Sequence, residues 1–338
     1  MAATAFAAPA HVRQNRVIEH GTAPSAVPQP EATGTTLTKK KTIKPYQPAA
    51  WGPRLGFGLL RLASLLPYRP MMALGRLLGR TVQRFVGRRE RIAGINLELC
   101  FPDLSERERE TLLRHHFEAL GMGVMTFAIA WWWPDRRLDP LVRIHGQEHL
   151  EAAFADGKGV IFFTGHFTAL EMSGRLLSRI APALPMYRPN ENPIIDRIIV
   201  KNRENHVERT IPRDDVRLMI RTLRANKGVW FAPDQNYGLK HSVFADFFGI
   251  PAATNTSTSR FAGLTGSRVI PFVVLADPEG GYDMYIEAPL DDFPTDDTQR
   301  DTQRLNDLIE GWARKAPAQY NWVHRRFKDR PDNAKRFY

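Results

Sequence analysis

In the second half of the chain, segments with the hydrophobic pattern of strands alternate with segments that have the pattern of helices. Short apolar runs rich in β-branched and aromatic residues predict buried strands, and stretches with apolar residues every three to four positions predict helices. Strands that alternate with helices indicate an α/β fold with a mainly parallel central sheet flanked by helices, with antiparallel pairing open to the last two strands. The expected strands are 160–163, 184–187, 209–212, 228–232, 269–275 and 282–286, and the expected helices are 193–205, 216–226, 256–263 and 298–315.

The first 88 residues have a different pattern. Residues 1–50 are rich in Ala, Pro, Thr and Gly, contain few large apolar side chains and end in a lysine cluster, which predicts a disordered basic tail. Residues 51–88 contain an apolar segment, 55–66, and then a helix, 71–87. We expect these to be amphipathic helices at a membrane interface, the alternative being surface helices with solvated arginines. Residues 89–338 then form the main domain.

The arginines of this second helix recur every four residues, at Arg76, Arg80, Arg84 and Arg88. They form a basic stripe beside an apolar face that includes Leu74 and Leu77. No apolar run reaches eighteen residues, so the sequence does not predict a conventional transmembrane helix.

Composition limits the class of partner. The chain has 338 residues, of which 43% are hydrophobic, so it is long and apolar enough for a substantial core. Its 47 Lys and Arg exceed its 36 Asp and Glu, and the net charge of +11 favours an anionic partner such as lipid headgroups, nucleic acid or an acidic carrier protein. The single cysteine excludes an intramolecular disulfide and a Cys-based metal cluster.

The strand expected at 160–163 leads into the most informative segment. A small turn, Thr164-Gly165, precedes His166, and Glu171 follows in the first turn of the next helix. If Glu171 points back, its carboxylate would fix the imidazole tautomer and leave the other nitrogen to accept a proton from a substrate hydroxyl. The alternative is a capping box between Thr168 and Glu171 with no chemical role.

Polar residues follow two other expected strands. Asp234, Gln235 and Tyr237 come directly after 228–232, and Arg188 follows 184–187. A parallel sheet would bring these loops to the edge that holds His166. Arg188 would bind a phosphate or polarise a carbonyl, although a plain turn and a solvated arginine remain alternatives.

The last aromatic-rich segment, 319–328, interleaves aromatic rings with cations, including Arg325. This composition suits lipid phosphate as well as nucleic acid. His324 is either a second base or a polar contact. The three adjacent tryptophans at 131–133 cannot all face one core, so at least one is expected at the surface or at an interface.

The motifs of several enzyme classes are missing. There is no Gly-x-Ser-x-Gly elbow, no P-loop, no complete Gly-x-Gly-x-x-Gly and no His-Glu-x-x-His. A serine hydrolase, a P-loop NTPase and a classical Rossmann dehydrogenase are therefore disfavoured.

From about residue 55 to 330 the chain resembles the lipid A secondary (lauroyl/myristoyl) acyltransferases of the lysophospholipid acyltransferase superfamily. The matching blocks are Asn96-Leu97, Cys100-Phe101-Pro102, Gly165-His166-Phe167, Leu170-Glu171, Tyr187-Arg188-Pro189-Asn190, Pro233 to Gly238, Ser242-Val243-Phe244, Phe247-Phe248-Gly249, Gln319-Tyr320, Trp322 and His324 to Lys328.

The resemblance implies a fold like that of the glycerolipid acyltransferases, with His166 as catalytic base and Glu171 as its partner. It also implies an acyl carrier protein thioester as donor, no cofactor or metal, and a lipid A precursor as acceptor at the cytoplasmic face of the inner membrane. A nucleic-acid partner is then not expected. Backbone N–H groups near the His166 turn, with Arg188, would stabilise the oxyanion.

Two departures keep alternatives open. Asn236 stands where the family pattern has an aspartate, and the Pro-Glu-Gly-Thr-Arg-like block of the glycerolipid branch is missing. The alternatives are the same chemistry on another membrane lipid, such as an ornithine lipid or a glycolipid, and a membrane-binding homologue without activity.

Overall fold

A computed structural model describes residues 51–277, 280–331 and 334–338. The basic tail expected over residues 1–50 lies outside these described residues. Within them the chain forms helices α1 (Trp51–Ala63), α2 (Tyr68–Gln83), α3 (Gly87–Cys100), α4 (Glu106–Trp132), α5 (Asp135–Leu138), α6 (His149–Ala155), α7 (Leu170–Ile180), α8 (Pro193–Arg203), α9 (Val216–Arg224), α10 (Ser257–Thr265) and α11 (Thr298–Lys315), and the short 3-10 helices η2 (Asp139–Leu141) and η3 (Pro317–Gln319).

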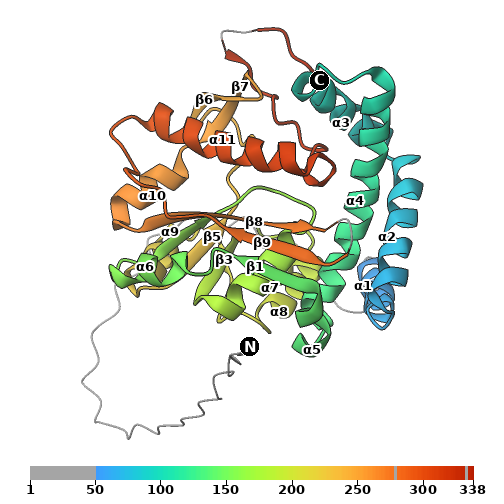
Figure 1. Cartoon of the computed structure of the whole chain (residues 1–338), viewed down its shortest axis with the longest axis horizontal. Coiled ribbons are helices and arrows are strands. Elements are labelled where there is room, and N and C mark those ends of the chain that lie inside the picture. The colour runs from blue at the N-terminus through green and yellow to red at the C-terminus, as the bar shows by residue number, and fades with distance from the viewer. Residues whose placement is uncertain (1–50, 278–279, 332–333) are drawn as a thin grey trace, which may run out of the picture. The chain divides into compact units, whose positions relative to one another are not determined.

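The described residues contain a seven-stranded sheet in the order β1-β9-β8-β2-β5-β3-β4 (Figure 1). The run from β8 to β4 is parallel throughout, while β9 pairs antiparallel with β8 and parallel with β1. The expectation of a mainly parallel sheet with an antiparallel late strand is confirmed. The strands are β1 (Val142–His145), β2 (Val160–Phe163), β3 (Ala183–Tyr187), β4 (Ile211–Pro212), β5 (Gly228–Phe231), β8 (Arg268–Ala276) and β9 (Tyr282–Ile286).

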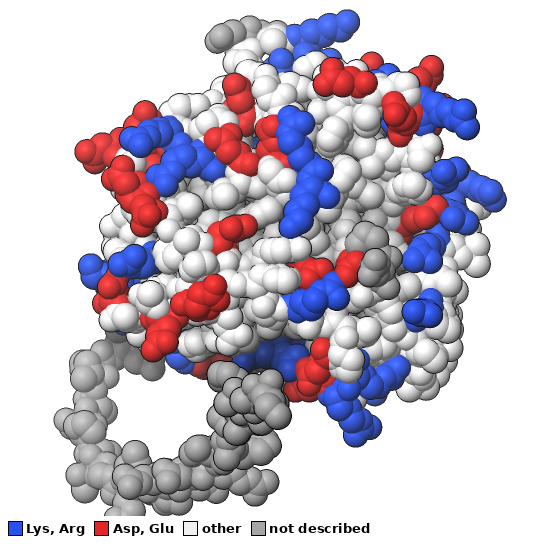
Figure 2. Space-filling view, viewed as in Figure 1, with Lys and Arg blue, Asp and Glu red and all other residues white. Residues whose placement is uncertain are grey.

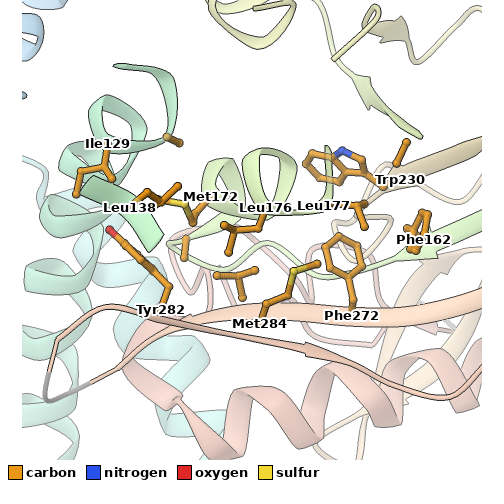
Figure 3. Packing of buried hydrophobic residues seen from close by; sticks show 14 of the residues in the cluster. Ile129, Leu138, Phe162, Met172, Leu176, Leu177, Trp230, Phe272, Tyr282 and Met284 are labelled. Carbon is orange, nitrogen blue, oxygen red and sulfur yellow. The ribbon is translucent and has the colours of Figure 1, made fainter. Parts of the chain in front are cut away.

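Helices cover both faces of this sheet, with α11 on one side and α7 and α8 on the other (Figure 1). Because side chains alternate along a strand, β2 contributes to two separate cores. Phe162 belongs to the same buried cluster as Met172 and Leu176 of α7 (Figure 3). Ile161 and Phe163 belong to the opposite core, with Ile309 and Trp312 of α11 among its other members. A strand buried on both faces explains why residues 160–163 read as a continuous apolar run.

Helix α2 packs backbone to backbone on α4. A Cβ added at Gly79 would lie 2.0 Å from the carbonyl oxygen of Phe117, and one at Gly121 would lie 2.1 Å from that of Gly75. Met71 and Met72 of α2 are buried in the same core as α7. Glycine is therefore required where the two helices touch, and α2 is fixed against the main domain.

Helix α1 differs from α2 because none of its residues is buried. Leu55, Leu59 and Leu62 lie at i, i+4 and i+7 and are exposed, at 65%, 58% and 62% respectively. No element of the described part of the chain covers this apolar stripe, which is unusual for a protein surface. No helix among the described residues is both long enough and apolar enough to span a bilayer.

The apolar segment 244–248 belongs to an antiparallel hairpin formed by β6 (Ser242–Phe247) and β7 (Ile250–Asn255). Its two-residue turn is Phe248-Gly249, both with positive φ, at 55° and 71°. Ala245 and Phe247 are buried. The patch is therefore largely core, under α11 and the C-terminal segment.

The three tryptophans at the end of α4 are all hydrogen-bonded through their indole nitrogens. Trp131 donates to Glu171, Trp132 to Asn202 and Trp133 to the carbonyl oxygen of Ser64. Trp131 and Trp133 are buried and Trp132 is half-buried, so none of the three rings is fully exposed. Separate elements (α7, α8 and the α1–α2 turn) each cover one ring.

Candidate active site

His166 lies at the carboxyl end of β2, in the turn that leads to α7. Its Nδ1 is 2.5 Å from Oδ1 of Asp234, and its backbone N–H donates to Oδ2 at 2.9 Å. The His166 side chain is 25% exposed, whereas that of Asp234 is 1% exposed. One histidine thus engages both oxygens of a buried carboxylate and still presents its ring to solvent.

The sheet register brings these two residues together. Strands β2 and β5 are parallel neighbours, with Phe163 opposite Phe231. His166 and Asp234 each lie three residues beyond that pair, in loops at the same edge of the sheet. This is the edge where parallel α/β sheets place their chemistry.

Asp234 is the ionised member of this pair. Burial opposes ionisation of Asp234, but the charge of His166 and the hydrogen bonds from its ring and backbone outweigh burial and lower the pKa of the carboxyl to about 2. Asp234 therefore stays a carboxylate at neutral pH. It fixes the ring with Nδ1 toward the acid and stabilises an imidazolium when Nε2 accepts a proton.

Glu171 does not contact His166, contrary to the expected dyad. Its Oε1 accepts from Trp131 at 2.6 Å, and its Oε2 accepts from the guanidinium of Arg203 at 2.7 Å. Helix α7 begins at Leu170 with Ala169 as its N-cap and no side-chain cap, so the alternative Thr168–Glu171 capping box is not formed either. The side chain of Glu171 instead meets α4 and α8, where the buried Arg203 compensates its charge.

The other predicted site residues contact partners other than His166 and Asp234. Gln235 and Tyr237 directly follow Asp234, and the Tyr237 hydroxyl donates to Gln235. Arg188 follows β3 with its side chain 60% exposed and 3.6 Å from Glu191. The guanidinium of Arg325 lies 5.8 Å from the ring of Tyr338, so it faces the C-terminal residues.

The C-terminal segment closes one side of the site, which the sequence did not predict. Asn321 donates its backbone N–H to the carbonyl oxygen of His166, and Thr168 donates its own to Gln319. His324 accepts from the backbone N–H of Asn236 at 2.9 Å. His324 was expected to be either a second base or a polar contact, and the structure shows the polar contact. Burial lowers its pKa to about 4, which keeps it neutral and able to accept.

Arg326 is structural and cannot serve as a surface anchor. It is buried, and its guanidinium donates to the carbonyl oxygen of Ala253, to Thr254 and to Asn306. These bonds tie the C-terminal segment to β7 and α11.

The expected oxyanion donors of the His166 turn are already in use. The N–H groups of His166, Phe167 and Thr168 donate to Asp234, Gly165 and Gln319, respectively. Arg188 is thus the remaining predicted donor. Within the described ranges, no group of three or more His, Cys, Asp or Glu side chains is placed to hold a metal ion.

An imidazole oriented by a buried carboxylate at the carboxyl edge of an α/β sheet is typical of enzymes that take a proton from a substrate hydroxyl. A family model described as bacterial lipid A biosynthesis acyltransferase matches residues 38–329. The chain belongs to this family, and it is an acyltransferase of lipid A biosynthesis.

Individual relatives agree with this assignment. The chain is 38% identical over 300 residues to the lipid A biosynthesis lauroyltransferase of Escherichia coli (strain K12), which covers 88% of this chain and 98% of that protein. It is 36% identical over 286 residues to the lipid A biosynthesis palmitoleoyltransferase of the same strain, over 84% and 93% of the two chains.

A solved structure of the 1-acyl-sn-glycerophosphate acyltransferase PlsC from Thermotoga maritima aligns with 71% of this chain and 97% of that chain. Its sequence identity is 13% and its TM-score 0.34, too low to bear on the fold.

Proposed function

We propose that the protein transfers a fatty acyl chain from an acyl carrier protein thioester to a hydroxyl group of a lipid A precursor. The observation that carries this proposal is the pair of His166 with the buried Asp234 at the carboxyl edge of the sheet. This pair lacks a nucleophile of its own. It therefore suits direct transfer between two bound substrates, with the acceptor hydroxyl as nucleophile.

The reaction follows from the ring geometry. Because Nδ1 is held by Asp234, Nε2 of His166 takes the proton of the acceptor hydroxyl as its oxygen attacks the thioester carbonyl carbon. The tetrahedral intermediate carries the negative charge on the former carbonyl oxygen, and Arg188 is our candidate to stabilise it. When the carbon–sulfur bond breaks, the departing thiolate takes the proton from the imidazolium, which regenerates the neutral ring.

We propose that Glu171 supports this site indirectly. Its ion pair with Arg203 joins the first turn of α7 to α8, and α7 begins directly after the His166 turn. Loss of either partner would leave a buried charge uncompensated next to that turn.

We further propose peripheral attachment to the cytoplasmic face of the inner membrane through α1 and α2. Besides the exposed leucines of α1, Leu74 and Leu77 of α2 are exposed. Along the edge of the molecule where α2 lies, the charged side chains in Figure 2 are mainly basic. An apolar stripe next to cationic residues suits the surface of an anionic bilayer.

The decisive assay supplies purified protein with an acyl carrier protein thioester and either a lipid A precursor or lysophosphatidic acid. We expect transfer to the precursor and little to lysophosphatidic acid. His166→Ala should lower turnover by about 10²–10⁴-fold, the usual contribution of a general base. Efficient transfer to lysophosphatidic acid with none to the precursor would place the protein in the glycerolipid branch. Transfer only to an ornithine lipid or another glycolipid would change the acceptor but not the chemistry.

A further inference from the structure

The arginines of α2 do not form one uniform stripe. Helix α2 ends at Gln83, so the single helix expected over residues 71–87 is wrong, and Arg88 belongs to α3. Nε of Arg80 donates to Oε1 of Glu118 at 2.7 Å, while Arg84 and Arg88 are exposed. Arg69 and Arg76 line a cavity of about 480 Å³ between α2, α4 and the end of β8. We call it the α2–α4 cavity. A volume of this size falls within the range of small-molecule sites.

The charges around this cavity are unevenly compensated. Two carboxylates line it, but Glu118 is paired with Arg80 and Asp277 is paired with Arg143. Arg69 and Arg76 have no ion-pair partner among the described residues. Among the described residues the cavity therefore offers two guanidinium groups without an ion-pair partner, which can bind a phosphate through paired N–H donors.

The remaining lining combines apolar and polar groups. Met72, Ala119 and Met122 supply apolar surface, and Thr168 and Gln319 supply polar side chains. Tyr68, His115 and Thr126 add further polar groups, and the side-chain amide of Gln319 is bonded to the backbone of Ala276. A lining that combines apolar and polar surface suits an amphiphilic ligand.

The position of the cavity connects the membrane-facing helices to the catalytic turn. Thr168, on its wall, is two residues beyond His166, and Gln319 on the same wall accepts from the Thr168 N–H. Helix α2 also contributes to the lining, and its Leu74 and Leu77 are exposed. A lipid that enters from the α1–α2 surface would thus place its headgroup here.

We propose that the α2–α4 cavity binds the phosphate-bearing sugar headgroup of the acceptor lipid, with Arg69 and Arg76 as the phosphate ligands. This inference rests on the proposed acceptor class. It replaces the anchors expected from the sequence, because Arg188 is our candidate to stabilise the oxyanion and the guanidinium of Arg325 faces the ring of Tyr338. Bulk membrane phospholipid carries the same phosphate chemistry, so the experiment must separate the two sources.

The test compares Arg69→Gln/Arg76→Gln with the matched control Arg84→Gln/Arg88→Gln, which removes the same charge from exposed arginines outside the cavity. Both are assayed in nonionic micelles without phospholipid, with an acyl carrier protein donor and with phosphorylated or dephosphorylated lipid A precursor. We expect the first variant to raise the acceptor KM about 10- to 100-fold, since a charged hydrogen bond contributes about 1.5–3 kcal/mol. Its kcat and donor KM should stay near wild type, and the control should match wild type throughout.

The effect should disappear with the dephosphorylated acceptor, and this readout separates phosphate binding from a general structural defect. An unchanged KM in Arg69→Gln/Arg76→Gln, or an equal rise in the control, would overturn the proposal. An increase produced instead by Arg188→Gln or Arg325→Gln alone would restore the earlier anchors.

Direct calorimetric titration of the phosphorylated precursor into the same micelles separates this inference from the proposed function. If wild type binds the precursor but transfers nothing to it, the function is wrong. The proposal for the α2–α4 cavity is then supported if Arg69→Gln/Arg76→Gln weakens that binding, and it is overturned if the binding is unchanged.

Discussion

Two buried carboxylates near the sheet edge have different partners and therefore different expected roles. Asp234 holds the ring of His166, whereas Glu171 holds the guanidinium of Arg203. The first pair involves a ring that is partly open to solvent, and the second is enclosed between α4, α7 and α8. Substitutions that keep the shape of each side chain should separate chemistry from stability.

We expect Asp234→Asn to lower kcat by about 10²–10⁴-fold with a modest change in melting temperature, because the amide no longer stabilises the imidazolium. Glu171→Gln should instead cost about 3–5 kcal/mol of unfolding free energy, because it leaves the charge of Arg203 buried without compensation. Turnover and denaturant titrations of both variants, measured where both are folded, test this. A Glu171→Gln enzyme of normal stability and greatly reduced kcat would instead support the direct role for Glu171 implied by the family resemblance.

One buried and one half-buried histidine, His116 and His324, predict an acid-sensitive fold. Burial lowers the pKa of His116 to about 4, and that of His324 also to about 4, against about 6.5 in an unfolded chain. In this window the unfolded state binds more protons, so stability is fully present above pH 6.5 and is lost as pH falls toward 4. Each histidine should contribute on the order of 3 kcal/mol to this loss. Asp234, with a pKa of about 2, contributes only below this window.

Melting temperature measured from pH 4 to 7 checks this expectation. His116→Asn should flatten the curve, because an amide can still donate to the carbonyl oxygen of Ala318 but does not titrate. A curve of equal steepness in that variant would contradict the assignment to His116.

At the scale of elements, the contact between α2 and α4 allows a matched pair of substitutions. Gly79→Ala would place a Cβ 2.0 Å from the Phe117 carbonyl oxygen, so the helices must separate, at a cost of about 1–3 kcal/mol or more. Gly94→Ala, inside α3, meets no atom within 4 Å and should stabilise the protein by about 0.5–1 kcal/mol. Urea unfolding of both variants measures the difference. Equal and small effects would mean that α2 is loosely docked.

The pattern of residues predicted most elements but not all of their pairings. Strands β2, β5, β8 and β9 were predicted because their apolar runs are continuous or alternate regularly. The β6–β7 hairpin was missed because its turn places a bulky residue, Phe248, at positive φ, where Gly or Asn is usual. Local preference gives way there to the packing of Phe248 against Phe101 and Trp322.

The site was predicted in part for a similar reason. His166, Asp234, Gln235 and Tyr237 were placed at one edge because parallel strands end there. Which carboxylate contacts the imidazole depends on the register of β2 against β5 and on Arg203, which competes for Glu171. Neither the strand register nor the contact with Arg203 can be inferred from the spacing of residues along the chain. The sequence therefore predicted Glu171, five residues after His166, as the partner.

At the scale of the whole molecule, the α1–α2 region determines how the enzyme would meet a bilayer. Deletion of all residues before 89 is a poor test, because Met71 and Met72 of α2 belong to the main core. Helix α1 has no buried residue, so its surface can be changed without loss of core packing. The membrane hypothesis can therefore be tested on a folded protein.

We expect Leu55→Ser/Leu59→Ser/Leu62→Ser to weaken co-sedimentation with anionic vesicles by at least about 10-fold, since each buried leucine contributes about 1.5–3 kcal/mol. The control Leu239→Ser/Leu264→Ser changes exposed leucines outside α1 and α2 and should bind like wild type. Added salt should weaken the remaining attachment of the α1 variant further, because each arginine near an anionic surface adds about 1 kcal/mol that salt screens. Equal binding of both variants would show that α1 does not enter the interface, and the arginines of α2 would then be the sole candidates for attachment among the described residues.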